Sequence, residues 1–344
     1  KPIYYIINQQ NITVPADASM VHLEGCSNII IQNLKIKHTY QAIALFNSSN
    51  CKIYGNTLEE NEIGIILSKS INNSIIGNEL LKNSDYSIKN YDSDNNTIAN
   101  NLIKANGGGI NNAGNSASSR NTVISSNQII ENNGCGIQAG IGTTITGNYI
   151  KENGQHAIYF WDASNSIIHK NTIKQNGNCG ISFTHAANAS ITGNDLSKNN
   201  IGIEMGTVLG QLSECSITEN NFAQNSNHAI IVYCDIRDSR FYLNNFIDNN
   251  NGSVQVSIKG RFVWKGDKDY NVSSNVFPQY APSYNAWDNG SMGNFWSDHN
   301  SNVEGATYEI AYRNIDRHPL RTPIEFKALE MPSIGTPQEF SSFP

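Results

Sequence analysis

The feature that most constrains this chain is an asparagine that recurs nine times at intervals of 21 to 26 residues. An apolar residue stands three positions before each copy, another stands two positions after it, and a second asparagine follows five positions after it. The nine copies are Asn56, Asn78, Asn101, Asn127, Asn148, Asn171, Asn194, Asn220 and Asn244. A repeat of this length is typical of solenoids and related arrays, in which each unit packs only on its neighbours.

Each repeat contains short runs rich in isoleucine, and asparagine or glycine separates one run from the next. Short β-branched runs bounded by these turn residues predict strands rather than helices. A period near 23 residues with about three strands per repeat predicts one coil of a right-handed parallel β-helix, with about ten coils in the stack. The leucine-rich repeat has a similar period, but its LxxLxLxxN frame is missing. The expected fold class is therefore all-β, a right-handed parallel β-helix.

The recurring asparagines predict a structural ladder. A buried amide without partners costs about 1 to 3 kcal/mol, so these side chains need hydrogen bonds. Stacked asparagines can bond to one another and to the turn backbone, and asparagine tolerates the left-handed conformations of tight turns. We expect this role, rather than ligand contact, for the whole column.

The repeat divides the chain into four parts. Residues 1–26 are expected to form leading strands, 27–260 the β-helix repeats, 261–320 an aromatic-rich C-terminal cap, and 321–344 an extended tail. Three of the four tryptophans and many other aromatic residues fall within the expected cap. No cap segment precedes the first coil in this sequence, so we expect upstream sequence or another chain to cover it.

Charge and hydropathy exclude several classes of partner. Only 15% of the residues are charged, where about 25% is usual. Asparagine, with 52 copies, supplies many of the polar residues instead. The net charge is −6 and there is no run of lysine or arginine, so no nucleic-acid partner is expected. No apolar stretch has the roughly 18 to 20 residues of a membrane-spanning helix.

Eight N-x-S/T sequons fit a glycosylated protein outside the cytoplasm. The predicted glycosylation sites are Asn11, Asn47, Asn72, Asn95, Asn188, Asn251, Asn271 and Asn289.

The repeat unit I-x-G-N-x-h-x-x-N-x-x-G-I, in which h is apolar, is complete in residues 53–65 and 191–203. Near the end, Gly293–His299 resembles a GNYWSDY signature, and Asp316–Leu320 resembles a D-x-x-P-L element. Together these motifs resemble the NosD-like family of parallel β-helix proteins. The resemblance implies a protein of the cell surface or extracellular space, with the periplasm as the alternative, because such proteins are frequent on archaeal surfaces and in bacterial periplasms.

The resemblance leaves cofactors open. Many family members carry an acidic calcium-type loop where this chain has Asn302–Thr307, and the family's namesake assists copper-site assembly in the periplasm. No run of Met, His or Cys here resembles a copper site, so no cofactor is expected, with calcium and copper as alternatives.

Parallel β-helices often act on polysaccharides, but the usual sets (NTD, DD, HG and RIK, or DPHD) are absent. The best remaining catalytic candidates are Asp162 and His185, which fall on successive coils with backbones about 4.8 Å apart. A histidine beside a carboxylate can serve as a general base. Exposed aromatic residues and carboxylates on one side are typical of a sugar-binding surface. The predicted carbohydrate-binding set is Tyr159, Trp161, Asp162, His185, Glu204, Tyr233 and Asp235.

Cys135, His156 and Cys179 fall in one column on three consecutive coils and are the candidate ligands for a soft metal. Their two-residue offset from an inward isoleucine column favours a position facing the core, where cysteine acts as a small hydrophobe. Cys26 and Cys51 lie near equivalent points of adjacent coils, so a disulfide between them is geometrically allowed.

Three functions follow from these observations. The first is a non-catalytic extracellular or envelope protein, structural or carbohydrate-binding, whose partners are cell-surface glycans and other copies of itself in a sheath, lattice or filament. The second is a polysaccharide lyase or hydrolase that uses Asp162 and His185. The third is a periplasmic copper-site accessory protein.

Overall fold

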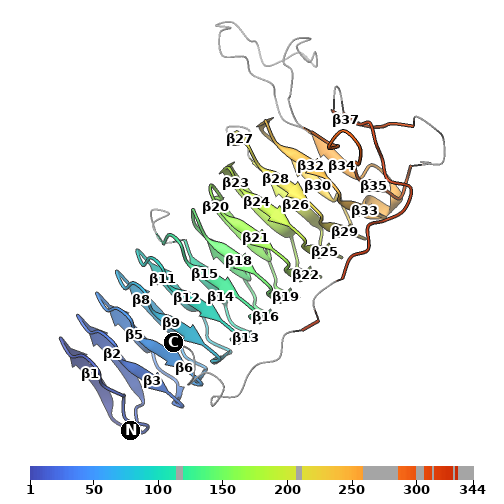
Figure 1. The fold of residues 1–344 in the computed structure, drawn as a ribbon. Helices are drawn as coiled ribbons and strands as arrows, with labels where there is room; N and C mark the ends of the chain where they lie inside the picture. Colours follow the sequence, from blue (N-terminus) through green and yellow to red (C-terminus); the bar gives the residue numbers. More distant parts are fainter. Residues whose placement is uncertain are drawn as a thin grey trace, which may run out of the picture.

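The chain folds into a parallel β-solenoid whose coils stack into a rod (Figure 1). The computed structural model describes residues 1–113, 119–206, 211–258, 286–299, 306–311, 314–327 and 330–331. Three long parallel sheets, of fourteen, eleven and ten strands, form the three faces of the rod. The prediction of an all-β parallel β-helix is confirmed. No helix within these ranges is long and apolar enough to cross a membrane.

The fourteen-stranded sheet carries the candidate site. It contains β1 (Ile3–Ile7), β2 (Met20–Glu24), β5 (Gln41–Phe46), β8 (Ile63–Ser68), β11 (Tyr86–Tyr91), β14 (Gly108–Asn112), β17 (Ile137–Ala139), β20 (Ile158–Asp162), β23 (Cys179–Ala187), β26 (Ile201–Met205), β30 (Ile230–Val232) and β34 (Val256–Ile258), with β27 (Gln211–Ser213) and β31 (Asp235–Arg237) beside this path.

The other two long sheets contain short strands only. The ten-stranded sheet contains β3 (Ile30–Gln32), β6 (Lys52–Tyr54), β9 (Ser74–Ile76), β12 (Thr97–Ala99), β15 (Val123–Ser125), β18 (Thr144–Thr146), β21 (Ile167–His169), β24 (Ser190–Thr192), β28 (Ser216–Thr218) and β32 (Arg240–Tyr242). The eleven-stranded sheet contains β4 (Lys35–Lys37), β7 (Thr57–Glu59), β10 (Glu79–Leu81), β13 (Leu102–Lys104), β16 (Gln128–Ile130), β19 (Tyr149–Lys151), β22 (Thr172–Lys174), β25 (Asp195–Ser197), β29 (Asn221–Ala223), β33 (Asn245–Ile247) and β35 (Phe295–Trp296). A 3₁₀ turn, η1 (Asn249–Gly252), follows β33, and β36 (Tyr308–Ala311) pairs antiparallel with β37 (Asn314–Asp316).

The asparagine ladder is present as predicted, and Asn132 of the companion column shows its wiring. Its backbone N–H donates to Asn153 Oδ1 at 3.1 Å, and its Nδ2 donates both to Asn153 Oδ1 and to the Ile103 carbonyl. Its own Oδ1 accepts from the backbone and side-chain nitrogens of Asn106. Each amide is thus fully bonded inside the rod, which offsets the cost of its burial.

A third ladder was not predicted. Ser48, Ser70 and Ser93 stack at another turn, where the backbone N–H of each donates to the hydroxyl of the next serine in the column. Asn73 and Asn96 stack in the same manner beside them. The column of Asn73 and Asn96 continues in altered form, since the backbone N–H groups of Thr143 and Cys215 donate to Ser166 Oγ and Ser239 Oγ. The change of residue type along the column hides this ladder in the sequence.

The C-terminal cap continues the repeat in altered form. Asn294 joins the ladder that runs from Asn56 to Asn244, which we call the first ladder. Its Oδ1 accepts from the backbone N–H of Asn244 at 3.0 Å. Asp316 then ends the ladder, because its Oδ2 accepts from the Asn294 backbone N–H at 2.7 Å. Gly293 leaves room for this carboxylate, since a Cβ there would lie 1.8 Å from Asp316 Oδ1. The family signature therefore encodes the closure of the ladder.

Aromatic rings fill the same end of the core. Trp296 stacks on Phe246 with ring centroids 4.3 Å apart, and Trp287 stacks on Phe241 at 4.5 Å. Beyond them, Ile324 of the tail forms two backbone hydrogen bonds with the Asn245 side chain. The other aromatic residues of the predicted cap, from Phe262 to Tyr284, lie outside the described residues, as does most of the Asn302–Thr307 loop.

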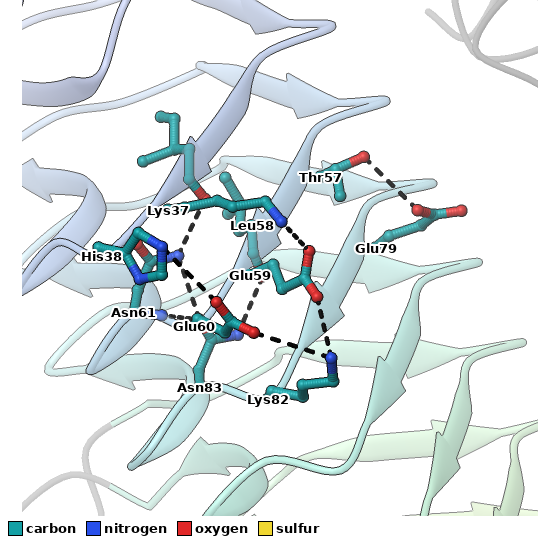
Figure 2. A network of polar contacts seen from close by, with 11 residues as sticks. Lys37, His38, Thr57, Leu58, Glu59, Glu60, Asn61, Glu79, Lys82 and Asn83 are labelled. Atoms are coloured by element: carbon teal, nitrogen blue, oxygen red, sulfur yellow. Dashed lines mark hydrogen bonds and ion pairs between the residues drawn. The ribbon is translucent and has the colours of Figure 1, made fainter.

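The outer surface of the eleven-stranded sheet carries ion pairs between successive coils (Figure 2). Glu59 lies between Lys37 and Lys82, with Lys82 Nζ 3.2 Å from Glu59 Oε1, and Glu60 faces both Lys82 and His38. The neighbouring lysines, Lys37 above all, lower the pKa of the Glu59 carboxyl. Exposed pairs of this kind contribute little to stability, so the buried amides beside them hold the coils together.

The disulfide between Cys26 and Cys51 that the sequence left open is not formed, and both thiols are free and buried. In this part of the rod the coils repeat every 22 residues, so the Cys26 backbone N–H donates to Ser48 Oγ of the next coil. Cys51 instead follows Asn50 and donates its backbone N–H to Asn73. The two cysteines are offset along the coil by three residues.

Candidate functional site

The candidate residues gather on the outer face of the fourteen-stranded sheet, over β20, β23 and β26. The strand geometry on β23 decides which of them point outward. A Cβ at Gly180 would lie 2.7 Å from Leu196 Cδ2 and 3.3 Å from Asn199 Nδ2, both inside the rod. Gly180 and Ile181 thus both face inward, and Cys179 before them faces outward.

The prediction that the Cys135, His156 and Cys179 column faces the core is therefore wrong. Cys179 belongs to a small apolar cluster with Ile201 and Ile231 that is separate from the main core, and Tyr233 packs against it. The irregular step at Gly180 shifts the strand's alternation by one residue, which the spacing argument did not include. Cys135 and Cys179 are buried and His156 is half-buried, but the column lies on the outside of the sheet.

The predicted neighbours Asp162 and His185 are aligned in register on β20 and β23. The Asp162 carboxylate, however, accepts hydrogen bonds from the backbone N–H and the hydroxyl of Ser164, at 2.8 and 2.6 Å. Both bonds end on Oδ1 and shape the turn after β20. His185 lies instead beside the Trp161 ring, with centroids 6.3 Å apart.

Trp161 is the most exposed aromatic residue on β20, β23 and β26, with 62% of its surface accessible, whereas Tyr5 on β1 of the same sheet is 64% exposed. It stands on β20 two residues after Tyr159, so both side chains point outward from the same strand. Trp161, Tyr159 and the half-buried His185 form what we call the aromatic platform. Because the strand is bonded on both sides, the platform is held on a rigid surface.

Glu204, Tyr233 and His156 form a second group beside the platform. Glu204 Oε2 accepts from Ser182 Oγ at 3.0 Å and from Cys179 Sγ at 3.5 Å. The His156 ring packs against Tyr159 with centroids 5.6 Å apart. Asp235 lies on β31, and its side chain falls outside the described residues. The predicted carbohydrate-binding set is thus split into two adjoining groups.

Burial sets the protonation of this second group. Burial, reinforced by the Glu204 charge, raises the pKa of the Cys179 thiol, and burial lowers the pKa of His156. Burial and the same carboxylate raise the pKa of Tyr233. At neutral pH the imidazole is therefore neutral and the thiol carries its proton.

The predicted metal ligands are brought together only in part. Within the described ranges, the one group of three whose ligand atoms lie close together is His156, Cys179 and Glu204, all within 4.8 Å of one another. Cys135 is not a member, and its thiol faces Gln155 Oε1 at 3.5 Å. Glu204 takes the place of Cys135 in the group. The alternation of inward and outward side chains is shifted by one residue on β26, and this shift could have indicated that Glu204 faces outward.

Seven of the eight predicted glycosylation sites lie in described residues, and all seven are exposed. Six of them, all except Asn289, have left-handed φ angles that asparagine favours at turns. Asn271 lies outside the described residues. Turn geometry alone accounts for these asparagines, and glycosylation stays a prediction.

Several solved structures share the architecture. The tailspike protein of E. coli bacteriophage HK620, solved in complex with a pentasaccharide, is 15% identical over 72% of this chain and 58% of its own, with a TM-score of 0.54. PfbA, a surface adhesin of Streptococcus pneumoniae, is 12% identical over 75% of this chain and 83% of its own, with a TM-score of 0.48. The periplasmic alginate epimerase AlgG is 14% identical over 74% of each chain, also with a TM-score of 0.48.

At these identities the likeness establishes the fold alone. No curated protein matches the sequence significantly. The family model described as periplasmic copper-binding protein (NosD) matches residues 4–123 and 117–232, which is more than half of the chain. The chain therefore belongs to the NosD family of parallel β-helix proteins.

Proposed function

We propose that this protein is a non-catalytic β-helix that binds polysaccharide outside the cytoplasm, in the periplasm or at the cell surface, through the aromatic platform. The observation that carries the proposal is Trp161, a large ring that is 62% exposed on a rigid central strand. An exposed indole of this kind packs well against the apolar face of a sugar ring, and the polar groups around it can bond to hydroxyls.

The relatives support this function in outline. The family description is periplasmic, and the HK620 tailspike, with a similar solenoid, was solved with a pentasaccharide. Catalysis has less support, because Ser164 already bonds to the Asp162 carboxylate. Binding needs only the exposed rings, which this face supplies.

Trp161→Ala is expected to weaken binding to a recognised glycan at least about tenfold, which corresponds to about 1.4 kcal/mol. The measurement is a glycan array followed by calorimetric titration of the best ligand. Tyr40→Ala is the matched control, since Tyr40 is 65% exposed on a distant coil and its loss should leave affinity unchanged.

Equal affinity of the Trp161→Ala variant and the unmodified protein would refute the aromatic platform as the binding site. Release of reducing ends or unsaturated uronates from the glycan panel, lost in Asp162→Ala, would replace binding by a lyase or hydrolase function.

A further inference from the structure

His156, Cys179 and Glu204 occupy outward positions on three successive coils. His156 directly precedes Ala157 and β20, Cys179 opens β23, and Glu204 lies on β26. Their imidazole nitrogen, thiol sulfur and carboxylate oxygen all lie within 4.8 Å of one another. The stacking of the coils therefore brings together three different donor atoms from residues 23 to 25 positions apart in the sequence.

Hydrogen bonding explains only part of this cluster. The Cys179 thiol and the Ser182 hydroxyl both donate to Glu204 Oε2, which satisfies that oxygen. His156 Nε2 lies 3.4 Å from Asn178 Nδ2. His156 Nδ1, in contrast, is buried and has no hydrogen-bond partner, one of three such atoms in the described part of the chain. A buried polar atom left unpaired costs about 1 to 3 kcal/mol, so it needs an explanation.

We propose that His156, Cys179 and Glu204 bind a late first-row transition-metal ion, either zinc or copper. One imidazole, one thiolate and one carboxylate are the donors that such ions accept, whereas Ca²⁺ and Mg²⁺ prefer sets of oxygen alone. The orphaned Nδ1 coordinates the ion when the imidazole carries its proton on Nε2, which then donates to the Asn178 side-chain oxygen once that amide turns over.

The dimensions of the cluster fit one ion. Bonds of about 2.0 to 2.3 Å place the donor atoms of a tetrahedral zinc roughly 3.3 to 3.8 Å apart. Donors within 4.8 Å reach that spacing by rotating the ends of the His156 and Glu204 side chains, both half-buried at the surface of the sheet. Three protein ligands leave a fourth position open to water or to a ligand of the platform.

The donor set accepts copper, which the family description names, as readily as zinc. Thiolate favours Cu(I) over harder ions, so the two metals have to be compared directly. The proposal does not rest on glycan binding, because Trp161, Tyr159 and His185 of the platform supply no ligand to the cluster, although Tyr159 packs against His156.

The experiment is calorimetric titration of the full chain with Zn²⁺, with Cu(I) under argon so that the thiol is not oxidised, and with Ca²⁺. Co²⁺ serves as a spectroscopic probe, since a bound thiolate gives it a charge-transfer absorption. We expect one equivalent of Zn²⁺ or Cu(I) to bind and Ca²⁺ not to bind. Cys179→Ser should remove the cobalt band and weaken binding at least about 100-fold.

Cys135→Ser is the matched control, because Cys135 belongs to the same column but lies outside the cluster. It should retain the cobalt band and full affinity. Glu204→Gln tests the site a second time in case Cys179→Ser folds poorly, which circular dichroism reveals, and it should weaken binding while keeping the thiolate. The proposal is overturned if neither Zn²⁺ nor Cu(I) binds, or if binding survives in both cluster variants.

Discussion

Asn132→Ala is expected to lower the free energy of unfolding by about 2 to 6 kcal/mol, because it opens the ladder in the middle of the rod. The substitution leaves the Asn106 backbone N–H and one N–H of the Asn106 side-chain amide buried without partners. Each such group costs about 1 to 3 kcal/mol. A single amide therefore matters more here than most core methyl groups, because three neighbouring coils share its bonds.

Urea unfolding followed by circular dichroism measures this loss. Asn133→Ala is the matched control, since Asn133 is the next residue in the chain and is exposed. Its loss should change the free energy of unfolding by less than about 0.5 kcal/mol. If both variants unfold at the same urea concentration, the ladder does not stabilise the stack.

Trp296→Ala is expected to cost about 3 to 5 kcal/mol, the usual range for a buried tryptophan replaced by alanine. The Trp296 ring is 1% exposed and lies between Phe246 and Tyr308, with centroids 4.3 and 4.0 Å away. Its Nε1 also donates to Asp316 Oδ2 at 2.9 Å. The variant therefore loses packing and one of the bonds that hold the ladder-ending carboxylate.

Because a solenoid is stabilised coil by coil, this damage should stay near the cap. Hydrogen exchange should show faster exchange in β33 and β29, with β8 and β11 unchanged. Trp161→Ala is the control for the loss of an indole, since Trp161 is exposed and should cost little. Uniform acceleration along the whole rod would contradict coil-by-coil stability.

Much of this fold was predictable because every coil meets the same physical demands. The asparagine columns predicted the ladders, since a buried side-chain amide needs hydrogen-bonding partners and the same asparagine on the neighbouring coil supplies them. The coil period also placed Asp162 beside His185 in the correct register. The signature Gly293–His299 predicted a family, but its role in closing the first ladder needed the position of Asp316, which lies 22 residues after Asn294.

The orientation of the metal column could not be derived from strict strand alternation. Gly180 and Ile181 both face inward, which breaks that alternation and turns Cys179 outward. A signal was available in the sequence, because the position of Gly180 is small in nine successive coils. Its counterparts are Ala42, Gly64, Ser87, Gly109, Gly136, Ala157, Gly202 and Ala229. A column of small residues beside a ladder indicates that the backbone itself packs against the core there.

The ladders also give the rod a direction. Every backbone N–H in a ladder donates toward the C-terminal end, so each coil depends on an acceptor supplied by the coil after it. At the last coil, Gln255 Oε1 accepts for the second ladder as Asp316 does for the first. A chain growing from the ribosome thus always exposes unfinished donors at its newest end. Each coil is completed when the next one is made, and synthesis of residues 255 and 316 supplies the last acceptor of the two ladders.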